Sequence, residues 1–294
     1  MKLVFIGSVE FSEKALKKLI ELGLEITGVI TKPESSFNAD FVDLSKLAKE
    51  YDIPCIYTKD INSEEIEVWI KERKPEVIFC LGWSQILGVQ ILNIPPKGVV
   101  GYHPAKLPQN KGRHPLIWAI VLGLEQTAST FFIMNAGADT GDIISQKNFK
   151  INFSDYASDV YIKMIDTALQ QLDDFIPEMI KNSLLRIPQQ QQTGNTWRKR
   201  GKNDGEIDFR MSTESIYNLI RGLSKPYVGA HLVYQGKEFI VWKSTPAENK
   251  AINIEPGKVL VVNKNKIKVK TGDSAIWLEE HELSNLPNTG DYIK

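Results

Sequence analysis

Short apolar runs alternate with amphipathic stretches along the first third of the chain. The apolar runs have the length of buried strands, and they predict strands at Leu3–Gly7, Leu24–Thr31, Ile53–Tyr57, Val77–Leu81 and Gly98–His103. Between them, apolar residues recur at helical spacing and predict helices at Phe11–Glu21, Asp43–Glu50 and Glu64–Lys74. This alternation predicts an α/β fold, a Rossmann-like, mostly parallel sheet with helices on both faces. In such sheets, ligands bind beyond the carboxyl ends of the strands.

The pattern changes in the second half of the chain. A long helix is expected over Ser154–Ser183, and Pro177 is expected to end or kink it. The polar run Pro188–Asn195 predicts a linker. Beyond it, one short helix (Thr213–Leu223) precedes alternating β-type runs, which predict a small, OB-like β-barrel. The expected organisation is a catalytic domain at 1–187, a linker at 188–203 and a C-terminal β-barrel-like domain at 204–294.

Charge and cysteine content narrow the class of protein. The 36 Lys and Arg residues balance 36 Asp and Glu residues, and the segment 204–294 carries 12 of each sign. This balance argues against a nucleic-acid partner, because affinity for nucleic-acid phosphates comes mainly from a basic protein surface. The apolar runs are too short for a membrane span or a secretory signal, so we expect a cytoplasmic protein with no membrane partner. Cys55 and Cys80 lie in strand-like runs and are expected to be buried thiols rather than a disulfide.

The segment from Gly101 to Asp142 carries the candidate chemistry. His103 ends an apolar run, and Pro104 after it favours an extended conformation. Asp139 follows His103 by 36 positions, in a glycine-flanked turn. A histidine at a strand end with a carboxylate in reach suits acid–base catalysis near neutral pH. Taken singly, His103 also fits a histidine that bonds a backbone carbonyl, and Asp139 fits an aspartate that stabilises its own turn.

An ordered series of short motifs connects these two residues. The motifs are His103-Pro104, Leu107-Pro108, Lys111-Gly112, His114–Leu116, Thr130–Met134 and Asp139–Ile143. In order and in His-to-Asp spacing, the series resembles the N10-formyltetrahydrofolate-dependent formyltransferases, which include methionyl-tRNA and amino-sugar N-formyltransferases. The opening FIGSVEFSEKAL and the segment Asp204–Ala230 resemble other parts of the same family, so the resemblance covers most of the chain.

The resemblance implies an enzyme that transfers a formyl group from N10-formyltetrahydrofolate to an amine, with no metal. Carried over by position, His103 is the general base or oxyanion partner, and Asp139 tunes it or relays the proton. The family's catalytic asparagine corresponds to Gly101, so one oxyanion donor is missing, a loss that typically costs about 2.7–4 kcal/mol. The substitutes that stay open are Ser84, Gln85, Asn110, a backbone N–H and protonated His103.

The resemblance also assigns binding residues. The loop after the strand Val77–Leu81 corresponds to the family's folate pocket, although a strand-to-helix turn with Trp83 in the core would explain it equally well. The residues expected to bind the folate are Gly82, Trp83, Ser84, Gln85, Ile86, Leu87, Gly137 and Asp142. Basic and aromatic residues are expected to bind the acceptor, since arginine grips a diphosphate with two hydrogen bonds. They are Tyr102, Lys111, Arg113, His114, Arg198 and Arg200.

Three acceptor hypotheses remain. The tRNA branch of the family carries a basic insertion after its second strand, and here that segment, Lys32–Leu44, is short and has one basic residue. With the neutral C-terminal part, this favours a nucleotide-linked amino sugar over methionyl-tRNA. The run LPQNKGRHPLIWAIVLGL resembles the sugar branch, and the pattern GYHP…GRHPLIWA…TASTFF resembles pseudaminic-acid-type glycan biosynthesis enzymes. UDP-4-amino-4,6-dideoxy-N-acetyl-L-altrosamine is therefore the expected acceptor. The third hypothesis, a catalytically weakened relative that only binds folate or a partner, rests on Gly101 alone. Whether the protein forms a homodimer stays open.

Overall fold

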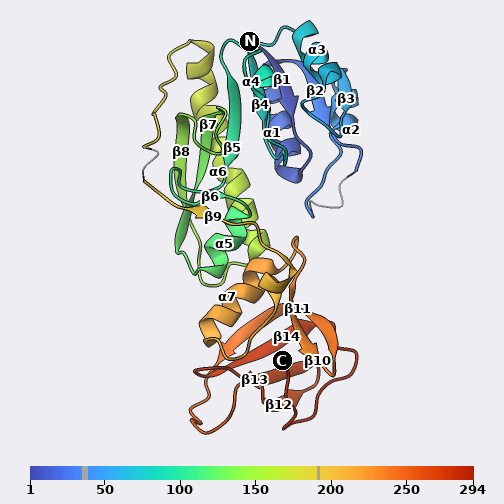
Figure 1. The fold of residues 1–294 in the computed structure, drawn as a ribbon, viewed down its shortest axis with the longest axis vertical. Coiled ribbons are helices and arrows are strands. Elements are labelled where there is room, and N and C mark those ends of the chain that lie inside the picture. The colour runs from blue at the N-terminus through green and yellow to red at the C-terminus, as the bar shows by residue number, and fades with distance from the viewer. Residues whose placement is uncertain (35–38, 191–192) are drawn as a thin grey trace. The chain divides into compact units, whose positions relative to one another are not determined.

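The structure is a computed structural model that describes residues 1–34, 39–190 and 193–294 (Figure 1). The chain forms two compact units. Unit 1 comprises Met1–Pro115, Thr127–Phe149 and Ile162–Trp197, and unit 2 comprises Leu116–Gln126, Lys150–Tyr161 and Arg198–Lys294. Unit 2 therefore includes two segments, Leu116–Gln126 and Lys150–Tyr161, that precede the predicted linker. A division of the sequence into consecutive domains does not assign these segments to the C-terminal part.

Unit 1 is built on a seven-stranded sheet with the order β3-β2-β1-β4-β5-β7-β8 (Figure 1). Its strands are β1 (Lys2–Ile6), β2 (Glu25–Thr31), β3 (Cys55–Tyr57), β4 (Val77–Cys80), β5 (Val99–His103), β7 (Gln126–Ile133) and β8 (Ile143–Lys150). The first five strands pair in parallel, and β7 runs antiparallel to β5. The predicted mostly parallel sheet is confirmed, and β5 ends at His103 as the sequence indicated.

The α-helices before the predicted linker are α1 (Glu10–Glu21), α2 (Ser45–Glu50), α3 (Glu64–Glu72), α4 (Val89–Leu92), α5 (Pro115–Val121) and α6 (Ala157–Ile180). Most of α5 and the first turn of α6 belong to unit 2. Helix α6 continues through Pro177, so the expected end at this proline is wrong. The buried side chains of Phe175, Ile176 and Met179 anchor the helix on both sides of the proline, and this packing outweighs the missing backbone hydrogen bond.

The two cysteines differ in environment. Both are free thiols, Cys80 is buried in β4, and Cys55 is exposed in β3. The prediction of a buried Cys55 is wrong because β3 is the short edge strand of the sheet, where only one neighbouring strand covers the backbone. Burial raises the pKa of the Cys80 thiol to about 12, which keeps it protonated and unreactive.

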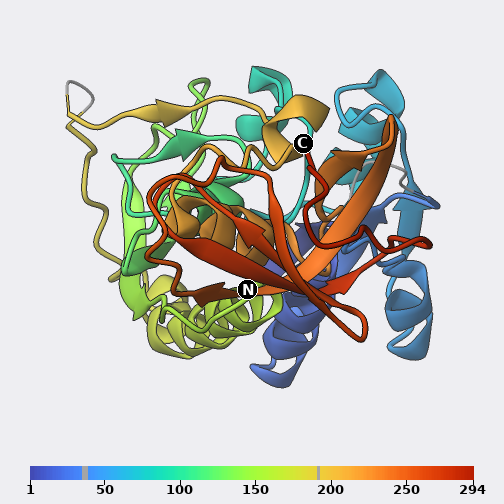
Figure 2. The ribbon, with the colours of Figure 1, turned by 90° about the horizontal axis from the view of Figure 1, so that it is seen from below.

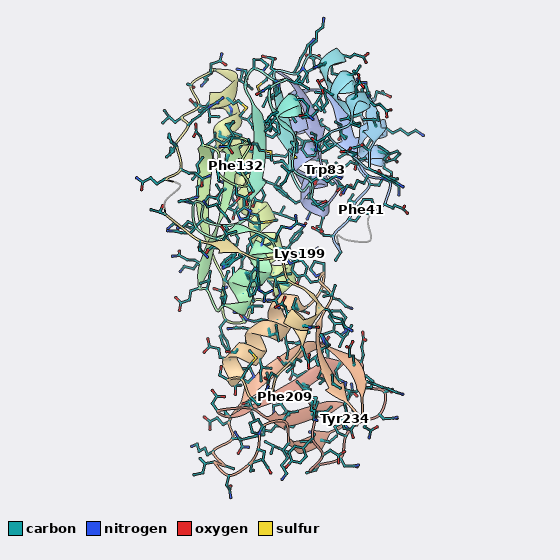
Figure 3. The ribbon with its side chains drawn as sticks, viewed as in Figure 1. Phe41, Trp83, Phe132, Lys199, Phe209 and Tyr234 are labelled. Atoms are coloured by element: carbon teal, nitrogen blue, oxygen red, sulfur yellow. The ribbon has the colours of Figure 1, made fainter. Side chains whose placement is uncertain are left out.

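Unit 2 contains a five-stranded antiparallel sheet with the order β10-β11-β14-β13-β12, drawn in orange and red in Figure 2. Its strands and helix are β10 (Ala230–Tyr234), β11 (Lys237–Ala247), β12 (Val259–Asn263), β13 (Lys266–Lys270), β14 (Ala275–His281) and α7 (Thr213–Leu223). Buried residues such as Ile216, Leu232 and Ile276 form one core with Phe209 and Tyr234, which are labelled in Figure 3. The predicted β-rich C-terminal part is confirmed. Among the described residues, no helix combines the length and apolarity that crossing a membrane requires.

Candidate active site

The last residue of β5, His103, has an oxygen atom near each ring nitrogen. The side chain is almost fully buried, and its Nε2 lies 2.8 Å from the carbonyl oxygen of Asn110. Its Nδ1 lies 3.7 Å from Oδ2 of Asp139. A carbonyl oxygen only accepts hydrogen bonds, so Nε2 carries the hydrogen in this contact. Turning the ring over would place a carbon atom at each position, so the contacts select this orientation.

The partner carboxylate, Asp139, lies in the turn between β7 and β8. Its φ of 57° is a left-handed conformation that aspartate tolerates better than most residues. Oδ2 accepts a hydrogen bond of 3.0 Å from the backbone N–H of Gly112. The side-chain amide of Gln189 donates to the backbone carbonyls of Asp139 and Gly141, at 3.1 and 2.7 Å. These bonds fix the turn and hold the carboxylate toward His103.

The close packing of this turn requires glycine at position 141. A Cβ there would lie 1.6 Å from the carbonyl oxygen of Ile133, far inside van der Waals contact with backbone that cannot yield. At Gly137, by contrast, the nearest atom would be Oγ1 of Thr140, at 2.2 Å, which belongs to a side chain. Asp142 closes the turn by accepting a 2.8 Å backbone hydrogen bond from Ile133. Gly137 and Asp142, the two residues of this turn that are expected to contact the folate, lie in the same β7–β8 turn as Asp139.

The loop after His103 is held by a second, two-stranded sheet. Strand β6 (Lys111–Gly112) pairs in parallel with β9 (Thr196–Trp197). The N–H of Lys111 donates to the carbonyl of Asn195, at 3.1 Å, and that of Arg113 donates to Trp197, also at 3.1 Å. Oδ1 of Asn195 accepts a 2.9 Å hydrogen bond from the backbone N–H of Asn110. The end of the predicted linker therefore lies against the loop that fixes His103.

Gly101 faces the same side of β5 as His103, because side chains alternate along a strand. A Cβ at Gly101 would lie 2.7 Å from Cγ of Met134 and 3.0 Å from the ring of Phe132, which β7 places opposite Gly101. Phe132 is labelled in Figure 3. The thioether side chain of Met134 thus fills the space that a side chain at position 101 would need.

Gly101→Asn should therefore destabilise the protein by about 1–3 kcal/mol, the usual range for overpacking a core, and should lower the turnover number. Combining it with Met134→Ala should recover part of the free energy of unfolding, because it removes the colliding atoms. Urea denaturation of the two variants and of Met134→Ala measures both effects. A Gly101→Asn protein as stable as the wild type, with faster turnover, would mean that Met134 yields easily and that only the amide is missing.

The loop after β4 contains most of the residues expected to bind the folate. Gly82 has a φ of 71°, and a Cβ there would lie 2.3 Å from the side chain of Val9, so only glycine fits. Trp83, labelled in Figure 3, keeps a buried indole N–H that has no hydrogen-bond partner among the described residues. The ammonium of Lys32 lies 4.7 Å from the centre of the Trp83 ring and 3.2 Å from Oγ of Ser84. The side chain of Ile86 is 70% exposed.

Two further residues of this loop, Gln85 and Leu87, have their side chains in contact with other parts of unit 1. The side-chain amide of Gln85 donates to the carbonyl of Lys59, at 2.8 Å, and its oxygen accepts from the N–H of Ile61, at 3.3 Å. These two bonds direct the amide toward the segment Lys59–Ile61 and use one of its two N–H hydrogens. Leu87 is buried in the apolar core of unit 1, so it can line a pocket only as part of its wall.

Among the residues expected to bind the acceptor, Tyr102 lies on the other face of the sheet. Its hydroxyl lies 2.9 Å from Oγ of Ser129, and its ring packs between Phe11 and Phe131. Burial raises the pKa of this phenol far above its usual value. Since strand residues alternate between faces, the partly buried side chain of Tyr102 lies on the face of β5 opposite His103.

The other basic residues fall into two groups. Lys111, Arg113 and His114 lie in unit 1, on or just after β6, and Nη1 of Arg113 lies 3.5 Å from the carbonyl of Ser84. Arg198 and Arg200 lie in unit 2, on either side of Lys199, which is labelled in Figure 3.

Internal contacts already engage both arginines of unit 2. Arg198 forms a two-pronged ion pair with Asp204, which holds the pKa of that carboxyl well below its usual value. Arg200 is buried, donates to the carbonyl of Asp204, and lies over the ring of Trp118 at 4.6 Å. An acceptor diphosphate at Arg198 would have to compete with Asp204, and Arg200 offers little free surface.

The His–Asp pair, the parallel sheet that presents it and the β-rich second unit agree with one family of enzymes. Residues 1–175 match the family described as formyl transferase, and residues 199–287 match the formyl transferase C-terminal domain. The chain belongs to this formyl transferase family, and it is a formyl-transferring enzyme.

Individual relatives show how far this similarity reaches. The chain is 31% identical to a methionyl-tRNA formyltransferase from Desulforamulus reducens, over 96% of this chain and 90% of that protein. Its fold is similar to that of an N-formyltransferase from Helicobacter canadensis, crystallised with folinic acid and dTDP-3-aminofucose. That likeness has a TM-score of 0.72 and 20% identity, and it covers 95% of this chain and 99% of the other. The chain spans less than half (44%) of HypX from Aquifex aeolicus in complex with tetrahydrofolic acid, with a TM-score of 0.67 and 17% identity over 97% of this chain.

Proposed function

We propose that this enzyme transfers a formyl group from N10-formyltetrahydrofolate to the amine of a nucleotide-linked amino sugar. The observation that carries the proposal is the His103–Asp139 pair at the carboxyl edge of β5. In the neutral ring, Nε2 holds its hydrogen on Asn110, so the lone pair of Nδ1 faces the carboxylate of Asp139. The Nδ1 lone pair of His103 and the carboxylate of Asp139 are both hydrogen-bond acceptors, so an N–H group placed beside them can donate to both. The amine of an acceptor substrate is such a donor.

The loop after β4 fits a flat heteroaromatic ring such as that of the folate. The buried indole N–H of Trp83, which has no partner within the part of the chain that the structure describes, would donate to a hydrogen-bond acceptor on the folate ring. The exposed side chain of Ile86 offers the ring an apolar surface. When bound, the folate supplies the activated formyl group. We assign its binding to Gly82, Trp83, Ser84 and Ile86, with Gly137 and Asp142 of the neighbouring turn.

In this proposal, His103 carries the proton through the reaction. As the amine nitrogen bonds to the formyl carbon, Nδ1 of His103 accepts the proton that this nitrogen loses. Asp139 stabilises the resulting imidazolium, because its carboxylate lies 3.7 Å from Nδ1. When the bond from the formyl carbon to the leaving nitrogen breaks, His103 returns the proton to that nitrogen. Bonds and protons therefore balance with no further reactant.

The negative charge that develops on the formyl oxygen needs a donor in place of the family's asparagine. The side-chain amide of Gln85 is bound to the backbone of Lys59 and Ile61, whereas Asn110 is engaged at its backbone N–H and carbonyl only. Ser84 retains a hydroxyl hydrogen, because its oxygen accepts from the ammonium of Lys32. Residue 84 follows β4, which pairs with β5, so it belongs to the same edge of the sheet as His103. We therefore assign the donor to Ser84, with the side-chain amide of Asn110, a backbone N–H or protonated His103 as the alternatives.

The choice of a sugar acceptor rests on charge. Of the three lysines of β13, Lys266 forms a 2.9 Å ion pair with Glu279, and the ammonium of Lys270 is buried against the carbonyl of Thr271. Over 204–294 as a whole, 12 acidic residues balance 12 basic residues, so this segment has no net positive charge to attract a phosphate backbone. Part of the segment where the tRNA branch has its basic insertion, residues 35–38, lies outside the described residues. A methionyl-tRNA acceptor is the second candidate, favoured by the identity to the Desulforamulus reducens protein.

Steady-state assays with N10-formyltetrahydrofolate and a set of acceptors test the proposal. UDP-4-amino-4,6-dideoxy-N-acetyl-L-altrosamine is expected to have the highest kcat/KM, above its dTDP-linked counterpart and above methionyl-tRNA. A higher kcat/KM for the dTDP-linked sugar would change the nucleotide and keep the sugar class. Transfer to methionyl-tRNA alone would refute the sugar acceptor, and transfer to none of them would favour a weakened, folate-binding relative.

A further inference from the structure

The orientation of the His103 ring depends on the backbone carbonyl of Asn110. The hydrogen bond from Nε2 to the carbonyl of Asn110 is the contact that leaves Nδ1 toward Asp139. Without this carbonyl, the neutral ring could carry its hydrogen on Nδ1 and donate it to Asp139. That second tautomer would have no lone pair on the side of the carboxylate, so it could not accept a proton there.

Asn110 supplies this carbonyl from an unusual conformation. Its φ is 62°, in the left-handed region, where asparagine is found more often than most other residues but which still costs energy. The surrounding structure must hold such a residue in place. One hydrogen bond does this from the N-terminal side, from the N–H of Asn110 to Oδ1 of Asn195, at 2.9 Å.

Asn195 binds the loop at two consecutive backbone N–H groups, those of Asn110 and Lys111. Its backbone carbonyl accepts from Lys111, at 3.1 Å, so one residue binds the N–H groups of both 110 and 111. The preceding residue, Gly194, has a φ of 104°, and a Cβ there would lie 2.2 Å from the carbonyl oxygen of Pro108. Only glycine therefore allows the chain to approach the loop closely enough for Asn195 to form both bonds.

We propose that Asn195 is a positioning residue of the active site, which sets the tautomer of His103 through Asn110. Its side chain fixes the peptide backbone of Asn110, the carbonyl of Asn110 holds the hydrogen on Nε2, and Nδ1 is thereby kept as the proton acceptor. This inference rests on the proposed role of His103 as the proton carrier. It adds to the active site a residue that lies 92 positions after His103 in the chain.

The variants Asn195→Ala and Asn195→Asp separate positioning from general stability. Asn195→Ala removes the acceptor and should lower kcat about tenfold, the factor that corresponds to one lost hydrogen bond, with KM within about twofold of the wild type. Asn195→Asp keeps an oxygen that accepts from Asn110 and should restore most of kcat. Thr196→Ala truncates the side chain that follows Asn195, at the start of β9, keeps its backbone bonds, and should leave kcat unchanged.

The nitrogen spectrum of the histidine ring provides a readout that a merely structural role would not change. In the wild type, ¹⁵N NMR should show His103 as the Nε2–H tautomer, assigned by the loss of its signals in His103→Gln. Asn195→Ala should show a mixture of tautomers. Asn110→Gly, which tolerates a positive φ, should keep the wild-type spectrum, and Asn110→Val, which does not, should lose it.

Three results would overturn the inference. They are a wild-type tautomer in Asn195→Ala, a kcat of Asn195→Ala equal to that of the wild type, and a loss of kcat that Asn195→Asp fails to restore. The NMR arm needs no acceptor substrate. If the wild-type protein transfers no formyl group, but Asn195→Ala still changes the tautomer of His103, the proposed function is refuted. The role of Asn195 in setting the tautomer then stands.

Discussion

His103→Gln should lower kcat for formyl transfer by about 100- to 10,000-fold, the range that a positioned acid–base group contributes. Glutamine keeps a polar side chain of similar length, but it cannot take up and return a proton. KM for the folate should change little, since the residues assigned to folate binding lie in other loops. Single-turnover measurements with saturating donor determine the rate of the chemical step, and circular dichroism confirms that the variant is folded.

His281→Gln is the matched control. His281 lies in unit 2 and, like His103, has its Nε2 2.8 Å from a backbone carbonyl, that of Asn265. Burial lowers the pKa of this imidazole, which keeps it neutral at pH 7. Its replacement should leave the transfer rate within about twofold. A His103→Gln protein that retains more than a tenth of the wild-type rate would remove His103 from the proposed mechanism.

Asp139→Asn should also reduce kcat by about 100- to 10,000-fold, for a different reason. Asparagine has the same shape, and its oxygen can still accept from the N–H of Gly112, so the turn should persist. The negative charge that stabilises the imidazolium of His103 is lost. The new amide can also donate to Nδ1, which would occupy the lone pair that accepts the proton.

The control for the aspartate is Asp173→Asn. Asp173 lies on α6 and forms a 2.7 Å ion pair with Lys18 on α1, a surface interaction that contributes at most about 1 kcal/mol. Its replacement tests whether loss of one carboxylate in unit 1 affects transfer in general. Equal activities of Asp139→Asn and Asp173→Asn would contradict the proposed role of Asp139.

The parts of the fold that the sequence predicted well are those with a strong local pattern. The apolar run before His103 defined β5 and its end, and the amphipathic run Thr213–Leu223 defined α7 to the residue. Strands β7 and β8 were not predicted as strands. Strand β7 is buried on both faces and shows no alternation, and β8, at the edge of the sheet, is mainly polar. Neither carries the period-two signal on which a strand prediction depends.

The site was predictable only where its residues lie in motifs. The spacing of His103 and Asp139 pointed to a pair, and the structure brings the two side chains within 3.7 Å. Asn195 was missed because a polar run rich in glutamine is typical of a linker, and no local pattern shows that it pairs with a loop 85 positions earlier. The same holds for Met134, whose position against Gly101 follows from the register of β7 on β5.

A competition in one reaction tests the central claim most directly. The enzyme receives limiting N10-formyltetrahydrofolate, together with equal concentrations of UDP-4-amino-4,6-dideoxy-N-acetyl-L-altrosamine and methionyl-tRNA. Mass spectrometry of both acceptors then measures where the formyl group has gone. We predict that the formyl group is found on the 4-amino group of the sugar in wild-type reactions and on neither acceptor with His103→Gln. Formyl groups mainly on methionyl-tRNA would contradict the proposed function.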